Sequence, residues 1–171
     1  MFGLFKKKPA TSGPDPRLLR LLEVYQGLEG QVEALYADVR HSPPELRFFA
    51  MSAISVYAQS YGQLPQREME ALITSFTEQA LALLIARMPQ ASFELLHQAF
   101  ADRFGEYAAL IIEVSNAESE SDLQQSTLAL INVLDRRAKV ERDMVDAIAP
   151  ALGLVMPLTH CQADVRDAMV A

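Results

Sequence analysis

Glu94 and His97 are the pair of residues whose types and spacing come nearest to a metal site. Residues three apart on a helix share one face, and some helical bundles bind metal ions through two such pairs plus carboxylates from two further helices. Asp38 and His41 repeat this spacing, but His41 adjoins a helix end, and the helix expected at 42–61 offers no carboxylate beyond Glu45. We therefore interpret both pairs as solvated helix flanks. Glu94 and His97 remain weak candidate ligands, and no cofactor is expected.

The chain contains few residues that are suited to nucleophilic catalysis. There are three histidines and one cysteine, with neither a G-x-S-x-G turn nor a glycine-rich phosphate loop. His160 precedes Cys161, and a neighbouring imidazolium can lower the pKa of a thiol, but consecutive residues of a helix do not face each other. A single cysteine forms no intramolecular disulfide, and a free cysteine is most often a buried, inert thiol. We predict that the protein is not an enzyme.

The first eight residues combine apolar and basic side chains in a segment that no core obviously requires. Its candidate contact residues are Phe2, Leu4, Phe5, Lys6, Lys7 and Lys8. Near an anionic membrane each lysine would contribute about 1 kcal/mol, and the apolar side chains would add partial burial. Three interpretations stay open: a disordered tail, contact with the cytoplasmic face of a membrane, or docking into a groove on this domain or on a partner.

A second candidate contact surface is the charged half of the helix expected at 121–149. Its basic residues are Arg136, Arg137, Lys139 and Arg142, and its apolar stripe is narrow, so this half is predicted to project beyond the bundle. The preceding segment 106–122 holds five acidic residues and no basic residue. We interpret it as a solvated face, with a site for a basic partner as the alternative.

The charge of the chain excludes one class of partner. The net charge is −7, but the first 20 residues contain five basic and one acidic side chain, so the remainder carries −11. A body of that sign repels phosphate backbones, and it lacks the basic stripe with interleaved aromatic residues that a nucleic-acid groove needs. We therefore expect no nucleic-acid binding.

The elements that must position these residues are all predicted to be helices. Residues 1–16, with three prolines and two glycines, form a tail and linker, and residues 17–171 form a single domain. Apolar period, caps and breakers indicate an all-α, up-and-down bundle of five principal helices plus a short C-terminal helix. The expected ranges are 17–39, 42–61, 65–88, 92–114, 121–149 and 159–169.

The helix expected at 42–61 should be the centre of the bundle, because no charged residue lies between Arg47 and Arg67. Ser42 with Glu45, and Ser121 with Gln124, have the spacing of N-terminal capping boxes. In the first helix, Gly27 and Gly30 indicate either close approach of a neighbouring helix or a kink.

We expect a non-enzymatic interaction module of the adaptor, regulatory or inhibitor type. Its expected address is the cytoplasm, since the N-terminus does not read as a secretory signal and no stretch approaches about 20 apolar residues, with action at the membrane face left open. The alternative is a bundle that binds a small apolar ligand or a metal between its helices. A protein partner is expected. The heptad-like face of the first helix could form a homodimer or simply pack on the second helix.

Overall fold

The structure, a computed structural model, describes residue 13 and residues 15–170. Within that range the chain forms six helices and no strand, which confirms the predicted all-α class. The helices are α1 (Pro16–Leu35), α2 (Pro43–Tyr61), α3 (Gln66–Arg87), α4 (Phe93–Ser115), α5 (Glu120–Ala138) and α6 (Ile148–Val170).

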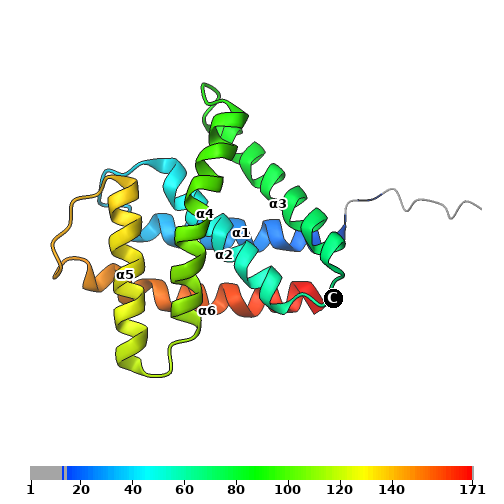
Figure 1. Cartoon of the computed structure of the whole chain (residues 1–171). Helices are drawn as coiled ribbons and strands as arrows, with labels where there is room; N and C mark the ends of the chain where they lie inside the picture. Colours follow the sequence, from blue (N-terminus) through cyan, green and yellow to red (C-terminus); the bar gives the residue numbers. More distant parts are fainter. Residues whose placement is uncertain (1–12, 14, 171) are drawn as a thin grey trace, which may run out of the picture.

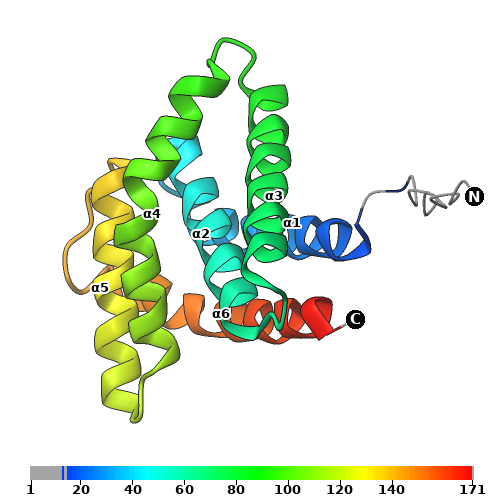
Figure 2. The ribbon, with the colours of Figure 1, turned by 45° about the vertical axis from the view of Figure 1, so that its right-hand side comes forward.

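The helices form two antiparallel pairs that cross each other. α1 and α6 lie side by side and run in opposite directions, while α4 and α5 form a second antiparallel pair steeply inclined to the first (Figures 1 and 2). α3 packs against α1, α2 and α4. The two pairs cross, so only some neighbouring helices are antiparallel. In the up-and-down bundle that the sequence predicted, all neighbouring helices would be antiparallel.

Helix α2 occupies the centre, as its uncharged sequence predicted. Every residue from Glu45 to Ala58 is buried, and the helix contacts all five others. Ser52 and Ser55 are buried with it: the Ser52 hydroxyl donates a 2.8 Å hydrogen bond to the Phe48 carbonyl, whereas the Ser55 hydroxyl has no hydrogen-bond partner among the described residues. This bond within the helix lets a serine lie in the core, because an unpaired buried hydroxyl would be costly.

The apolar face of α1 is used entirely within the chain. Its large side chains, including Leu21, Tyr25 and Val32, are buried where α1 contacts α2, α3 and α6. This packing leaves that face unavailable for a homodimer contact. Gly27 and Gly30 are exposed, and a Cβ atom on either would meet nothing within 4 Å. Of the two predicted explanations, the close approach of a neighbouring helix is therefore wrong, and the kink stays a prediction.

The long helix expected at 121–149 is wrong, because the chain turns back at Lys139. This residue adopts left-handed backbone angles (φ 60°, ψ 40°) and ends α5, and residues 139–147 then return toward the bundle. Ser119 caps the start of α5 by accepting a hydrogen bond from the Asp122 amide at 3.1 Å, two residues before the predicted cap. The charged half of the expected helix therefore does not project.

The C-terminal helix is 23 residues long rather than short, because neither of its prolines ends it. Pro150 lies in the first turn, where the missing amide has no helical acceptor to lose. Pro157 lies inside α6 and removes one hydrogen bond, yet buried residues on both sides of it, Leu154 and Leu158, hold the helix against the core. Tertiary packing therefore keeps α6 continuous through Pro157, although a proline inside a helix favours a break.

Among the described residues, α3 is the one helix whose length and hydropathy would also suit a membrane span. Only 33% of its most apolar 18-residue window is buried, whereas the core helices of globular proteins that meet the same criterion are mostly buried.

Candidate functional site

The predicted metal ligands lie on the surface. Glu94 and His97 are both exposed on α4, and the His97 ring stacks on Phe93 with ring centroids 6.1 Å apart. Across residues 15–170, no three His, Cys, Asp or Glu side chains are grouped to hold a metal ion. The pair is therefore placed on a solvated flank.

The predicted contact residues of the tail, Phe2 to Lys8, lie outside the described residues. Of the second set, Arg136 and Arg137 both bind Glu106 of α4: the Arg136 guanidinium lies 2.6 Å from one carboxylate oxygen, and that of Arg137 lies 2.7 Å from the other. These ion pairs join α5 to α4. Glu106 is thus ion-paired, although the sequence predicted that the whole acidic segment 106–122 is a solvated face.

Arg142 is held in a buried cluster that sequence reasoning missed. Its guanidinium lies 3.4 Å from the Asp135 carboxylate and 4.6 Å from the centre of the Tyr36 ring, and its side chain is only 8% exposed. The Tyr36 hydroxyl donates a 2.7 Å hydrogen bond to Asp135. Burial raises the pKa of the Asp135 carboxyl, whereas Tyr36 and Arg142 lower it. Lys139 remains exposed at the end of α5.

Two further clusters repeat this combination of tyrosine, acid and arginine. In the first, the Tyr107 hydroxyl donates to Glu45 at 3.0 Å, and Arg103 binds the other oxygen of that carboxylate at 3.3 Å. The predicted capping box at Ser42 and Glu45 is not formed: the Ser42 side chain makes no capping hydrogen bond, its amide donates to the Ala138 carbonyl at 2.8 Å, and the Glu45 carboxylate binds residues of α4.

The other cluster joins α1, α2 and α3. Glu29, which is 4% exposed, binds Arg47 at 2.8 Å and also Arg87, and the Tyr25 hydroxyl is buried among these residues without a hydrogen-bond partner. In all three clusters the ionised groups are paired with each other across helices. Their geometry supports structural roles and offers no free acid or base to a substrate.

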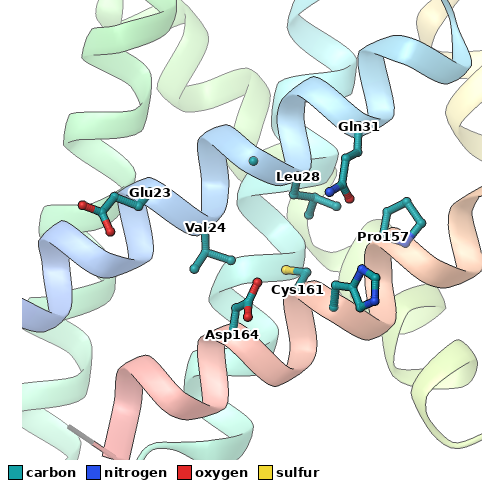
Figure 3. A pocket seen from close by; sticks show the side chains of 9 residues that line it. Glu23, Val24, Leu28, Gln31, Pro157, Cys161 and Asp164 are labelled. Carbon is teal, nitrogen blue, oxygen red and sulfur yellow. The ribbon is translucent and has the colours of Figure 1, made fainter.

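Cys161 lies at the floor of a groove between α1 and α6 (Figure 3). The groove has a volume of about 250 Å³, with Val24 and Leu28 on its α1 side, Glu23 and Asp164 toward one end, and Gln31 and Pro157 toward the other. The cysteine is 3% exposed, and burial raises the pKa of its thiol. A buried thiol with a raised pKa is protonated and weakly nucleophilic, so the groove offers no thiolate.

The other side of α6 carries a continuous apolar stripe in solvent. Ile148, Leu152 and Met156 follow one another at spacings of four residues, and their side chains are 48%, 50% and 56% exposed. Met144 and Val145, each 73% exposed, lie in the loop just before the helix. The stripe exists because residues 147–163 contain no Asp, Glu, Lys or Arg, so both faces of this half of α6 are uncharged. We call these five residues the α6 stripe.

A second groove, between α5 and α6, borders the stripe. It has a volume of about 310 Å³ and shares Ile148 and Leu152 with the stripe. The α5 wall presents amide and hydroxyl groups beside one leucine, contributed by Ser121, Gln124, Gln125, Thr127 and Leu128. Together the stripe and this groove form a concave, apolar surface with a few polar groups at one side.

Acidic side chains flank the α6 stripe at both ends. Glu141, Asp143 and Asp146 lie in the preceding loop, and Asp164 and Asp167 lie on the last turns of α6, where Asp164 also lines the α1–α6 groove; all five are exposed. Arg166 is 3.5 Å from Asp167 and offsets one of these charges. The surface therefore has an apolar centre and a negative rim.

Sequence reasoning did not identify this surface, although its signal was present. The lack of charge in residues 147–158 was visible, but two prolines and a glycine favoured a loop, and a loop has no fixed face.

Comparisons with models of known protein families, with curated proteins and with solved structures find no match.

Proposed function

We propose that this protein is a non-enzymatic interaction module that binds a segment of a protein partner on the α6 stripe and the adjoining α5–α6 groove. The observation that carries the proposal is the run of exposed Ile148, Leu152 and Met156 on a helix face without charge. Isolated exposed apolar residues are ordinary on protein surfaces, whereas a contiguous patch beside a groove is typical of a binding surface.

The shape of the surface favours a helical partner segment. The three residues of the stripe that lie on α6 itself, Ile148, Leu152 and Met156, are spaced i, i+4 and i+8, and the α5–α6 groove runs beside them. An amphipathic helix that presents apolar residues at the same spacing would bury them in such a groove. These three side chains are already about half buried, so each would contribute roughly half of the 1.5–3 kcal/mol that full removal from water supplies, and contacts in the groove and at the charged rim must offset the rest of the cost of association.

The charge of the rim indicates the sign of the partner. Five exposed carboxylates surround the stripe, with Arg166 as a partial offset. Lysine or arginine residues beside the apolar anchors of the partner would speed association and exclude acidic competitors. The same charges repel an anionic lipid surface, so they support a protein segment over a membrane as the occupant of this site.

A non-enzymatic role is supported by the state of the groups that could perform catalysis. Glu29, Glu45 and Asp135 are committed to buried ion pairs, and Cys161 is a buried thiol. A small apolar ligand is the alternative occupant. The grooves on either side of α6, about 250 and 310 Å³, lie below and at the lower end of the usual range for ligand pockets, and the larger groove of about 520 Å³ between the start of α1 and the end of α6 is lined in part by Asp15, Arg17 and Arg20.

Substitution of Leu152 by Asp tests the proposal. A charge at the centre of the stripe should abolish partner contact without unfolding the chain, because the side chain is half exposed. The matched control is Leu95→Asp, since Leu95 is 72% exposed on α4 and lies outside the stripe. The measurement is crosslinking and mass spectrometry in cells, comparing wild type with both variants.

The expected result is a partner whose crosslinks map to α5 and α6 and disappear in Leu152→Asp but persist in Leu95→Asp. Crosslinks that are lost equally in both variants, or that never involve α6, would contradict the proposal. Co-sedimentation with phosphatidylserine vesicles is the second arm, and binding that requires Leu152 would replace the protein partner with a membrane.

A further inference from the structure

We propose that residues 2–8 of the chain itself occupy the α6 stripe, so that a partner must displace them to bind. This inference rests on the function proposed above and adds a regulatory element to the same site. It follows from the chemistry of the segment, from the place where the tail joins the domain, and from the order of charges along α6.

The segment has the composition that the site requires. Phe2, Leu4 and Phe5 supply large apolar side chains, and Lys6, Lys7 and Lys8 supply three positive charges directly beside them. The α6 stripe is apolar with exposed carboxylates at its ends. Apolar anchors next to lysines therefore match the stripe and its rim.

The tail enters the domain at the end of α6. Asp15 and Pro16 line a groove together with Ala168 and Met169, and the start of α1 lies at the same end of the molecule as the C-terminus (Figure 1). Measured along α6 at 1.5 Å per residue, Met156 lies roughly 20 Å and Leu152 roughly 26 Å from Met169. The ten residues from Asp15 to Phe5 span up to about 33 Å when extended, so the apolar residues can reach both.

The order of basic and apolar residues in the tail matches the order of acidic and apolar residues along α6. A tail that runs from Asp15 back along α6 passes the exposed Asp167 and Asp164 first, and Met156 and Leu152 afterwards. In the sequence the lysines lie nearer to Asp15 than the apolar residues do. Asp164 lies only about 8 Å along α6 from Met169, so a path that is contracted over residues 9–14 and extended over residues 2–8 places Lys6–Lys8 near the carboxylates and Phe5, Leu4 and Phe2 over the stripe.

A tethered occupant competes strongly even when its intrinsic affinity is low. A short tether holds a linked segment near its site at an effective concentration in the millimolar range. A partner then binds with an affinity reduced by the fraction of molecules whose site is open. A partner therefore needs a higher intrinsic affinity for the site than it would need if the tail were absent.

Paramagnetic NMR on the full-length chain tests this proposal. A Gly3→Cys variant carries a nitroxide at residue 3 only, because Cys161 is buried. Methyl-labelled methionines report its position: Met144 and Met156 lie in the stripe, and Met88, at the end of α3, is the control. We expect broadening at Met156 and little at Met88. Leu152→Asp, or reversal of Lys6, Lys7 and Lys8 to Glu, should remove the broadening.

A second measurement separates this proposal from the proposed function. The probe is a helical peptide with leucines at i, i+4 and i+8 flanked by lysines, titrated onto full-length protein. Phe2→Ser combined with Phe5→Ser should raise its affinity about tenfold if the tail covers the site for roughly nine-tenths of the time. No broadening at Met156 in wild type, or an unchanged peptide affinity, would overturn the tail proposal.

If the peptide still shifts Met156 under those conditions, the docking surface stands and only its regulation is wrong. If the peptide does not bind at all, both proposals fail. Mixing nitroxide-labelled chains with methyl-labelled chains distinguishes the remaining case. Broadening between different molecules would show that the tail binds a second copy, which overturns occupation within one chain.

Discussion

At the scale of residues, three clusters, each of one tyrosine and one buried acid paired with one or two arginines, connect segments that are distant in sequence. Tyr36 and Asp135 are 99 positions apart, and Tyr107 and Glu45 are 62 positions apart. A buried ion pair need not increase net stability over an apolar replacement, but the loss of one member leaves the other unpaired in the core. These clusters therefore specify which helices pack together.

Replacement of Asp135 by Ala should destabilise the protein by about 3 kcal/mol, because it leaves the Arg142 charge and the Tyr36 hydroxyl buried without their acceptor. Urea unfolding followed by circular dichroism measures the change. Asp102→Ala, at an exposed carboxylate on α4, is the control and should change stability by less than about 0.5 kcal/mol. If Asp135→Ala and Asp102→Ala were equally mild, the cluster would not be a structural contact.

The buried tyrosines predict a loss of stability in alkali. Burial raises the pKa of Tyr57 to about 12 and raises the pKa of Tyr25, Tyr36 and Tyr107 as well. A pKa that is higher in the folded state than in the unfolded chain stabilises the fold fully below the unfolded value of about 10, and this contribution is lost as the pH rises through the folded value.

Between pH 10 and about 12, the free energy of unfolding should therefore fall, and most tyrosinate absorbance at 295 nm should appear together with the loss of helical circular dichroism. Complete tyrosine ionisation near pH 10 in a protein that remains helical would show that these hydroxyls are accessible to solvent.

At the scale of elements, the turn at Lys139 decides the architecture of the C-terminal third. Local signals favoured one helix over 121–149, but the chain reverses at Ala138, and Val140 and Ala147 of the returning loop are buried. The apolar contacts of this loop outweigh the cost of a left-handed lysine, which is about 1–2 kcal/mol.

Lys139→Gly should raise stability by up to about 1 kcal/mol, because glycine adopts a positive φ without steric conflict. Lys139→Ala should have little effect. The measurement is the midpoint of thermal unfolding. The opposite result, in which glycine destabilises by about 1 kcal/mol relative to alanine, would mean that residue 139 is inside a continuous helix.

At the scale of the whole molecule, the charges separate into an apolar-basic N-terminal segment and an acidic body. The first 20 residues carry +4 against −11 for the rest, and part of the acidic excess surrounds the α6 stripe. Such an arrangement favours basic apolar segments, whether they belong to the chain itself or to a partner.

The affinity of the lysine-flanked peptide should therefore fall as salt rises, because exposed charges are screened over about 10 Å at 0.1 M ionic strength and about 3 Å at 1 M. Isothermal titration at several salt concentrations measures this dependence. Asp164→Asn with Asp167→Asn should flatten it. An affinity that does not respond to salt would indicate that the acidic rim does not take part.

The sequence by itself determined the helical class, the starts of α1, α3 and α4 to within a residue or two, and the central place of α2. These features depend on local signals: apolar period, prolines at helix starts, and the absence of charge between Arg47 and Arg67. The tail residues remain a prediction, because they lie outside the described residues.

Only the tertiary structure decided the end of α5, the continuity of α6 through Pro157, and the burial of Arg142. Each depends on contacts between residues far apart in the chain, whose energy no local pattern contains. The exposure of the α6 stripe to solvent also depends on such contacts. Its lack of charge is written in the sequence, but which side of an uncharged helix meets solvent is set by the helices that cover the other side.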